Sequence, residues 1–358
     1  MHAIVMAGGS GTRFWPSSRK DRPKQFLCIT GEKSMIEETC NRLAPIAKDD
    51  EITIILGKDH FNEASEMFND RGIKILAEPV GRNTAPCIGL GALYARHSGC
   101  KGAVAFLPAD HFIGDTGSFL SCLEQAGKAA ETGGIITLGI VPTRPETGYG
   151  YIHRSKTCLD SFESPVYEVL AFVEKPDTDT AREYLTSGEY FWNAGIFVAT
   201  PETVLKEIQQ HMPRLYQGLM HLENAFDEDS FEEKFEQVYS ELESISFDYG
   251  IMEKTKASVC VVPCECGWSD VGSWASLHEL RECSHDSSRN ISEGEALLVD
   301  CKNSYVSAMS GRIVACLGIE DLVIVDTEDA VLVADIKRSQ DIKVIVEKLK
   351  TMKKEKLL

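Results

Sequence analysis

The sequence predicts an α/β protein: a mostly parallel, mixed β-sheet flanked by helices, followed by a small C-terminal β domain with a terminal helix. Two observations predict this fold. Short apolar runs alternate with helical patterns through the first half of the chain, which is typical of a largely parallel sheet. After a polar stretch at 281–295, short apolar segments recur at fairly even steps, which indicates a small all-β unit such as a few coils of a β-helix.

The first part of the chain contains the strands of the predicted sheet. The run HAIVMA at 2–7 predicts a short buried strand that opens the protein. We expect further strands at 52–56, 73–77, 102–110 and 134–140, and helices at 59–68, 84–97 and 119–131. From residue 149 the pattern is mixed, with strands expected at 149–153, 166–176, 190–199 and 257–263 and helices at 201–211 and 231–242. Ligands of such sheets bind beyond the carboxyl ends of the strands.

The C-terminal part of the chain is predicted to form a separate β unit. We place the domain boundary between residues 284 and 285, giving domains 1–284 and 285–358. Short strands are expected at 296–300, 304–308, 313–317, 322–326 and 331–335. A basic amphipathic helix is expected at 339–356. Its apolar stripe favours packing or a dimer contact over a membrane anchor; the stripe consists of Ile342, Val344, Ile345 and Leu349.

Composition restricts the functional classes. A net charge of -18 argues against general nucleic-acid binding and would repel anionic substrates unless a local basic patch attracts them. No stretch approaches the roughly 20 apolar residues of a membrane span. The N-terminus lacks the basic region of a signal peptide. We therefore expect a cytoplasmic protein without a membrane or nucleic-acid partner.

The twelve cysteines are scattered and are expected to be reduced thiols. In CVVPCEC, Cys260, Cys264 and Cys266 invite a zinc interpretation. That spacing is not Cys-x-x-Cys, and no second pair of ligands follows, so zinc is disfavoured.

A glycine-rich turn follows the first strand. In MAGGSGTRFWPSSRKDRPKQF, Gly8, Gly9 and Gly11 remove side chains where the backbone turns or approaches a ligand. Exposed N–H groups after a strand suit phosphate. The segment fits neither the P-loop nor the dinucleotide motif, because Phe14 stands where the third glycine of the latter belongs. Five cations follow the turn: Arg13, Arg19, Lys20, Arg22 and Lys24.

Several further polar residues are ambiguous when each is taken alone. Asp110 follows a strand and Asp270 lies in the turn GWSDVGSW, and either could be a helix cap. Glu174 and Lys175 in FVEKP could form a surface ion pair. Asn193 in FWNAGIF could belong to a structural turn.

Taken together and in this order, these segments resemble the nucleotidyltransferases that make sugar nucleotides, and most closely the mannose-1-phosphate guanylyltransferases. The resemblance spans residues 6–274, and the tail is similar to that family's small β domain. It is carried by AGGSGTRFWPSSRKDRPKQF, EPVGRNTAPCI, LPADHFI, TGYGYI, FVEKP, FWNAGIF, FDYGIMEK and GWSDVGSW. FWPSSR and EPVGRNTAP favour the guanylyl branch. The chain ends at Leu358, so the isomerase module of the longer family members is expected to be absent.

The resemblance implies a Rossmann-like nucleotidyltransferase domain that transfers GMP from GTP to α-D-mannose 1-phosphate by in-line attack at the α-phosphorus, with Mg²⁺ as cofactor. A sugar phosphate is mostly dianionic at neutral pH and needs no general base. The resemblance also implies a role for each candidate site residue. The catalytic residues would be Arg13, Lys24 and Lys175, and the metal ligands Asp110 and Asp270. The sugar would be bound by Gly148, Glu174 and Asn193, and the nucleotide by Ala7, Gly8, Gly9, Ser10, Gly11, Glu78, Asn83 and Thr84.

Two alternatives stay open. A nucleotidyltransferase of the same fold could use another nucleotide or another sugar 1-phosphate, such as that of glucose or a heptose. A non-catalytic paralogue could sense nucleotide sugars, although such paralogues usually lose parts of the catalytic set. We also expect a homodimer.

Overall fold

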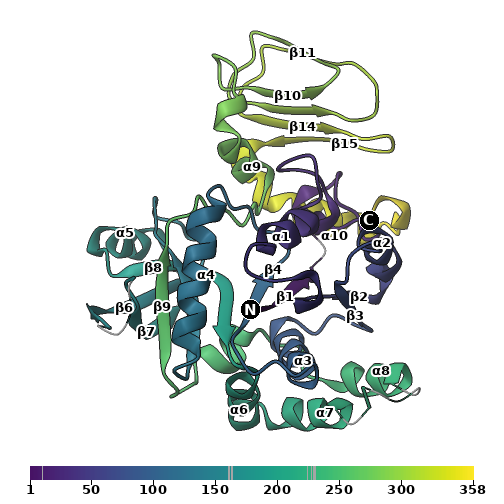
Figure 1. Cartoon of the computed structure of the whole chain (residues 1–358). Coiled ribbons are helices and arrows are strands. Elements are labelled where there is room, and N and C mark those ends of the chain that lie inside the picture. Colours follow the sequence, from purple (N-terminus) through teal and green to yellow (C-terminus); the bar gives the residue numbers. More distant parts are fainter. Residues whose placement is uncertain (10, 160–161, 163, 224, 227, 229–230) are drawn as a thin grey trace. The chain divides into compact units, whose positions relative to one another are not determined.

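The structure is a computed structural model that describes residues 1–9, 11–159, 162, 164–223, 225–226, 228 and 231–358 (Figure 1). It contains two compact units. Unit 1 consists of Met1–Gly8, Thr39–Ala109 and Ile113–Trp268, and unit 2 consists of Gly9–Glu38, Asp110–Phe112 and Ser269–Leu358. These units follow contacts rather than chain order, so the boundary at 284/285 stays a prediction.

Unit 1 is built around a mixed nine-stranded sheet of order β3-β2-β1-β4-β8-β5-β9-β7-β6. Strands β1 to β4 are mutually parallel, and β5 is parallel to β9. Strand β8 lies antiparallel between β4 and β5, which makes the sheet mixed. The strands are β1 His2–Ala7, β2 Ile52–Gly57, β3 Lys74–Glu78, β4 Val104–Pro108, β5 Ile135–Ile140, β6 Tyr151–Cys158, β7 Tyr167–Val173, β8 Tyr190–Ala199 and β9 Val259–Cys264.

Helices pack on this sheet and complete its core. Helix α3 packs against β1, β2 and β4, and its other side contacts α6 and α7, so it is buried nearly all round (Figure 1). Helix α4 packs against β5, β8 and β9. The helices of unit 1 include α2 Phe61–Met67, α3 Thr84–His97, α4 Thr116–Ala130, α5 Thr178–Ser187, α6 Pro201–His211, α7 Pro213–Glu223 and α8 Phe231–Glu241, while α1 Met35–Leu43 runs from unit 2 into unit 1.

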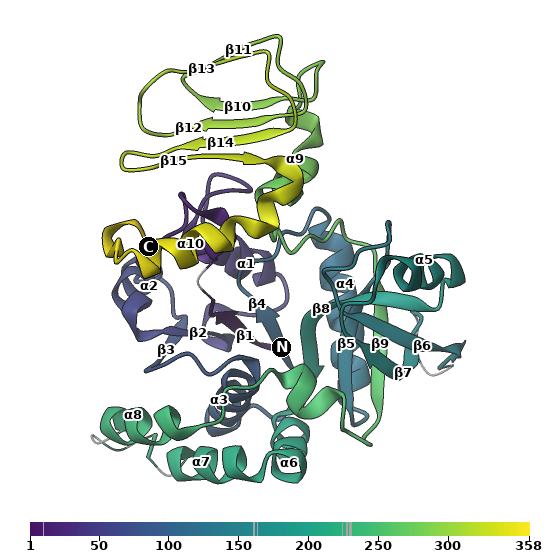
Figure 2. The same ribbon diagram turned by 180° about the vertical axis from the view of Figure 1, so that it is seen from behind.

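Unit 2 contains the β-helix (Figure 2). Strands β10, β12 and β14 pair in parallel, with Ile291 beside Tyr305 and Tyr305 beside Val323, as in successive coils. Strand β15 pairs antiparallel with β14, and β11 and β13 form a separate parallel pair. The elements are α9 Trp274–Leu280, β10 Ile291–Gly294, β11 Ala296–Val299, β12 Tyr305–Ala308, β13 Val314–Leu317, β14 Leu322–Asp326, β15 Val331–Asp335 and α10 Ile342–Thr351.

The core of unit 2 joins the glycine-loop region to this domain. Phe14 packs against Trp274 with ring centroids 5.0 Å apart, and Trp274 packs against Tyr305 at 5.2 Å. Ile342 and Val346 of α10 belong to the same buried cluster. The terminal helix therefore packs through part of its predicted apolar stripe, whereas Val344 and Ile345 stay exposed.

The predicted strands and long helices are present, but within the described residues strand β10 and helices α1, α5, α7 and α9 were not predicted. Helix α5 is short and begins at a local cap, in which the Asp177 carboxylate accepts a hydrogen bond from the Thr180 N–H at 2.8 Å. The terminal α-helix is shorter than predicted, because residues 336–341 form a 3₁₀ turn. All twelve cysteines carry free thiols. Among the described residues, no helix combines the length and apolar character needed to cross a membrane.

Candidate active site

A pocket of about 330 Å³ lies within unit 2 and gathers six of the predicted site residues. Two are loop glycines, two are cations and two are carboxylates. The pocket is lined by Gly9, Gly11, Thr12, Arg13, Phe14, Lys24, Asp110, His111, Asp270 and Gly272.

Gly11 brings the glycine loop against the basic segment. It has a left-handed backbone (φ +56°), and a Cβ built there would lie 2.6 Å from Lys24 Cβ and 2.8 Å from the Lys24 backbone nitrogen. Only glycine fits this contact. The Gly11 carbonyl accepts hydrogen bonds from Phe14 N at 2.9 Å and from Ser18 Oγ at 2.7 Å. The chain between Arg13 and Lys24 thus folds back, and both cations line one pocket.

Lys24 is a buried cation with three acceptors around its ammonium group. Nζ donates to the Asp110 carbonyl at 2.8 Å, to Asp110 Oδ2 at 2.9 Å and to the Asp270 carbonyl. Burial by itself would raise the pKa of Asp110, but the Lys24 ammonium, helped by His111, brings that pKa below its ordinary value. Asp110 is therefore ionised at neutral pH, with a third of its side chain still exposed.

A two-stranded bridge joins the two acidic segments, although 160 positions separate them in the chain. Phe112 N donates to the Ser269 carbonyl at 2.9 Å, and Ser269 N donates to the Phe112 carbonyl at 3.1 Å. Asp110 and Asp270 lie close to the two ends of this bridge. Their common place at the pocket follows from this backbone pairing.

The turn at Asp270 holds both the Asp270 carboxylate and the Arg13 guanidinium in place. Gly272 N donates to Asp270 Oδ1 at 3.1 Å, and Arg13 Nη1 donates to the Gly272 carbonyl at 3.0 Å. A Cβ at Gly272 would lie 2.5 Å from Asp270 Oδ2 and 3.1 Å from Arg13 Nη1. Glycine at this position lets the carboxylate and the guanidinium approach each other.

Arg19, another cation of the basic segment, has a partner outside the pocket. Arg19 Nη2 binds Asp329 Oδ1 at 2.8 Å, and its guanidinium lies over the Trp15 ring at 5.4 Å. The Lys20 backbone N–H donates to the Leu358 carbonyl at 2.7 Å. Arg19 thus helps to hold the glycine-loop region to the β-helix rather than lining the pocket.

Unit 1 contains the other predicted site residues that the structure describes. Ala7 ends β1 and is buried, and Gly8 follows it at the surface; Ser10 lies outside the described residues. Asn83 caps α3 with its side chain on Thr84 N at 2.8 Å. Asn83 has φ +66°, a conformation uncommon outside glycine.

Glu78 lies at the end of β3 and is only 5% exposed. Its carboxylate accepts a hydrogen bond from the Tyr239 hydroxyl of α8. Burial raises the pKa of Glu78 to about 7, against a smaller opposing effect of the Tyr239 hydrogen bond. Glu78 therefore faces the protein interior in this structure.

The predicted sugar-binding residues fall into two groups. Glu174 and Asn193 meet at Gly150, where a Cβ would lie 2.8 Å from Glu174 Oε2 and 3.6 Å from Asn193 Cβ. Lys175 forms an ion pair with Glu174. Gly148 is exposed, and its N–H donates to Glu146 Oε1 at 3.0 Å.

Two residues of this cluster were missed by the sequence reasoning. Gly150 is the second glycine of TGYGYI, and only the long-range pairing of Asn193 N with the Gly150 carbonyl at 2.8 Å shows its place. Asp248, within FDYGIMEK, accepts a hydrogen bond from Asn193 Nδ2 at 2.7 Å. The quoted motifs contained both residues, but no local signal distinguished them.

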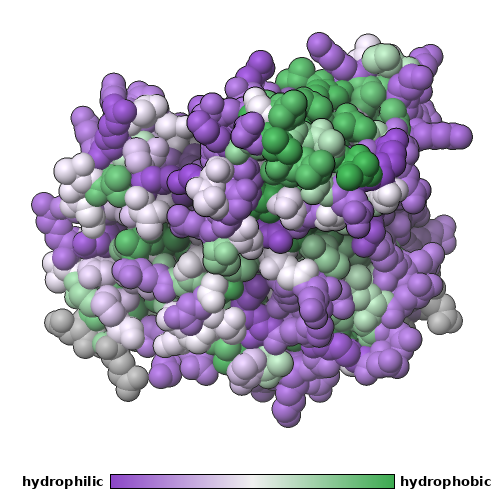
Figure 3. Space-filling view, turned by 90° about the horizontal axis from the view of Figure 1, so that it is seen from above, coloured by the Kyte–Doolittle hydropathy of each residue, from purple (hydrophilic) through white to green (hydrophobic). Residues whose placement is uncertain are grey.

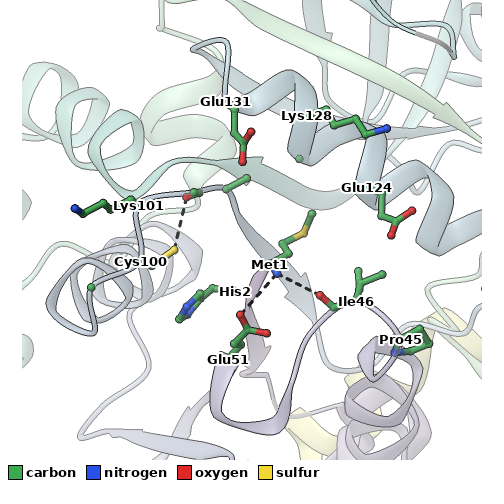
Figure 4. A pocket seen from close by; sticks show the side chains of 14 residues that line it. Met1, His2, Pro45, Ile46, Glu51, Cys100, Lys101, Glu124, Lys128 and Glu131 are labelled. Atoms are coloured by element: carbon green, nitrogen blue, oxygen red, sulfur yellow. Dashed lines mark hydrogen bonds and ion pairs between the residues drawn. The ribbon is translucent and has the colours of Figure 1, made fainter.

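A second, larger hollow of about 800 Å³ lies in unit 1 at the amino end of β1 (Figure 4). The Met1 ammonium there donates to the Ile46 carbonyl at 3.2 Å and lies 4.0 Å from the Glu51 carboxylate. None of the described residues that line it is a predicted site residue. It is located at the end of β1 opposite to Gly8.

The fold is that of a nucleotidyltransferase. Residues 2–287 match the family described as nucleotidyl transferase. Residues 294–349 match the mannose-phosphate isomerase/GMP-like β-helix domain, which covers most of the coils described above.

Relatives specify the family within this class. The chain is 41% identical over 98% of its length to the mannose-1-phosphate guanylyltransferase of Escherichia coli K12, covering 73% of that protein. It is 41% identical over 97% of its length to the xanthan biosynthesis protein XanB of Xanthomonas campestris, again covering 73%. The chain belongs to the mannose-1-phosphate guanylyltransferase family and is a nucleotidyltransferase.

A solved structure shares this fold. A crystal structure from Thermus thermophilus, described as a mannose-1-phosphate geranyltransferase, superposes with a TM-score of 0.87 at 36% identity and covers 98% of this chain and 99% of that one. The predicted combination of an α/β nucleotidyltransferase fold with a C-terminal β-helix is thus confirmed.

Proposed function

We propose that the enzyme transfers GMP from GTP to α-D-mannose 1-phosphate, giving GDP-mannose and pyrophosphate. The observation that carries this proposal is the pocket of unit 2, where Arg13 and Lys24 lie with Asp110 and Asp270 beside the glycine loop. Such a set suits a substrate with several phosphates that binds together with a divalent cation.

The chemistry needs little from the protein beyond positioning and charge. A non-bridging oxygen of the sugar phosphate attacks the α-phosphorus of GTP in line, and the bond from that phosphorus to the β-phosphate oxygen breaks. The attacking phosphate is mostly dianionic at neutral pH, so no general base is required. Two anions must be held together, which makes cations at fixed positions the main catalytic contribution.

Lys24 and Arg13 are assigned to neutralise the negative charges of the phosphates. Lys24 contacts oxygens around the α-phosphorus, and Arg13 stabilises the leaving pyrophosphate. The three acceptors around Lys24 Nζ hold its ammonium group at the pocket before substrate binds. Because an ammonium group has three N–H donors, at least one of these hydrogen bonds must be shared or released when Lys24 contacts phosphate. The N–H groups of the glycine loop hold the triphosphate.

Mg²⁺ fits the acidic residues of this pocket. Asp110 and Asp270 line the pocket and offer hard oxygen donors. A site with two carboxylates is typical of Mg²⁺, which completes its shell with water and substrate phosphates. When bound, the ion offsets the negative charge of the phosphates.

Residues of unit 1 are assigned to the sugar and the base. Lys175 holds the sugar phosphate, and Glu174 and Asn193 hydrogen-bond the sugar hydroxyls, which their meeting at Gly150 supports. Gly148 is assigned a position where its backbone lies close to the sugar, because glycine has no side chain in the way. Asn83 and Thr84 are assigned to the guanine or its ribose, whereas Glu78 is buried against Tyr239 and has no assigned contact with the nucleotide.

An assay of pyrophosphate release tests the activity and the substrates together. GTP with mannose 1-phosphate should be the preferred pair among nucleoside triphosphates and the 1-phosphates of mannose, glucose and heptoses. A preference for another pair would establish a different nucleotidyltransferase of this fold. Binding of GDP-mannose without turnover would favour a sensing paralogue.

We also propose that the enzyme is a cytoplasmic homodimer. The twelve free thiols support a reducing compartment. The dimer is supported by an apolar patch on the β-helix, seen in Figure 3. It is formed by side chains of β11 and β13 and by Ile313 just before β13, where Leu297, Val299, Ile313 and Leu317 are 44–74% exposed. Exposed apolar patches of this kind mark protein contacts. Light scattering of the purified enzyme tests the dimer.

A further inference from the structure

A short segment at 245–252 contacts the strand that carries Asn193. The segment ends in a π-helical turn, Asp248–Met252, a form that occurs often at functional sites. Asp248 is the first residue of that turn, and its Oδ1 accepts a hydrogen bond from Asn193 Nδ2 at 2.7 Å. The turn therefore supports the side chain of Asn193, which is assigned to the sugar.

The same segment also holds the loop assigned to the nucleotide. Phe247 N donates to Thr84 Oγ1 at 2.8 Å, one residue before Asp248. Ala85 N donates to the Ile245 carbonyl at 3.1 Å. Consecutive residues thus contact both parts of the site, and Phe247 is anchored by its ring, which lies 5.1 Å from that of Phe197.

The Asn193 carboxamide has a defined orientation in this arrangement. Its Oδ1 accepts from Gly195 N at 2.9 Å, while its Nδ2 donates to Asp248. A carboxamide has a donor end and an acceptor end of similar shape, so its hydrogen-bond partners decide which end faces a ligand. The Gly195 N–H donor and the Asp248 Oδ1 acceptor together fix this orientation, because each occupies one end of the carboxamide.

We propose that Asp248 is a positioning residue that sets the orientation of the Asn193 carboxamide and thereby the choice among sugar 1-phosphates. This inference rests on the proposed function, because it assigns a sugar to the Asn193 cluster. Epimers differ in the direction of one hydroxyl, so a fixed donor and acceptor can distinguish them. Asp248 acts through Asn193 and has no assigned contact with the reacting atoms.

The test compares two substitutions of Asp248 in the full-length enzyme. Asp248→Ala removes the acceptor, and the KM for mannose 1-phosphate should rise about five- to tenfold, the usual effect of losing one hydrogen bond. The KM for GTP should stay within twofold, and the kcat/KM preference for mannose over glucose 1-phosphate should fall. Asp248→Asn keeps an acceptor oxygen and should restore the sugar KM and the preference.

Thr255→Val is the matched control. It removes a hydrogen bond from Thr255 Oγ1 to Glu207 just beyond the same segment. It should lower thermal stability without changing either KM or the sugar preference. A fall in stability alone therefore cannot explain the Asp248→Ala result.

Three results would overturn the inference: an unchanged sugar KM in Asp248→Ala, an equal rise of both KM values, or no rescue by Asp248→Asn. If the wild-type enzyme turns over no sugar 1-phosphate, the proposed function fails instead. GDP-mannose binding by calorimetry then decides, and equal affinity of wild type and Asp248→Ala overturns the inference.

Discussion

Gly11→Ala tests the contact on which the pocket depends. The new Cβ would lie 2.6 Å from Lys24 Cβ and 2.8 Å from the Lys24 backbone nitrogen, neither of which is the far end of a flexible side chain. One of the two segments must therefore shift. Overpacking costs ~1–3 kcal/mol, and the left-handed backbone adds ~1–2 kcal/mol for alanine. The expected loss of unfolding free energy is ~2–5 kcal/mol.

Activity should fall as well, because Lys24 is displaced from its three acceptors. A displacement of about 1 Å at a catalytic group can reduce turnover about 10²-fold. The assays are urea unfolding and GTP-dependent pyrophosphate release at saturating substrate.

Gly188→Ala is the matched control for the backbone term. Gly188 has φ +66°, and a Cβ there meets nothing within 4 Å. This variant should lose only ~1–2 kcal/mol of unfolding free energy and should keep its turnover. Equal losses in the two variants, or wild-type turnover in Gly11→Ala, would refute the argument that Gly11 positions Lys24.

Further predictions concern the metal site, a buried acid and the dimer. Asp110→Ala and Asp270→Ala should each lower kcat by at least ~10²–10³ in steady-state assays; near-normal turnover at saturating Mg²⁺ would contradict the metal role. The pKa of Glu78 is raised from 4.5 to about 7, so the folded protein keeps this proton while the unfolded chain loses it. The free energy of unfolding of the wild type should therefore decrease by up to ~3 kcal/mol as pH rises from about 4.5 to about 7. Glu78→Gln should remove this decrease in unfolding experiments, and the same pH dependence of stability in wild type and variant would contradict the role of Glu78. Leu317→Glu should convert the proposed dimer into a monomer in light scattering, whereas a wild-type mass would place the interface elsewhere.

Local patterns were sufficient for most strands and for part of the site, but not for β10, which lies in the stretch predicted as a polar boundary. Alternating apolar runs located β1 to β9, and the glycine turn with its cations located Arg13 and Lys24. The sequence could not show why these two cations share a pocket. That depends on Gly11 lying against Lys24, a contact between positions 13 residues apart.

The remaining features depend on long-range contacts without a local signal. Asp110 and Asp270 share a pocket because Phe112 pairs with Ser269. Glu78 was assigned to the nucleotide from a motif, but its burial depends on Tyr239, 161 positions away. Asp248 was overlooked because its partner Asn193 is 55 positions away.

The most direct test of the account is a crystal structure of the enzyme with GTP and Mg²⁺. We predict the triphosphate against the glycine loop, with Arg13 and Lys24 on its oxygens and the ion bound by Asp110 and Asp270. A triphosphate bound at another place, or an ion that contacts neither aspartate, would contradict the central claim.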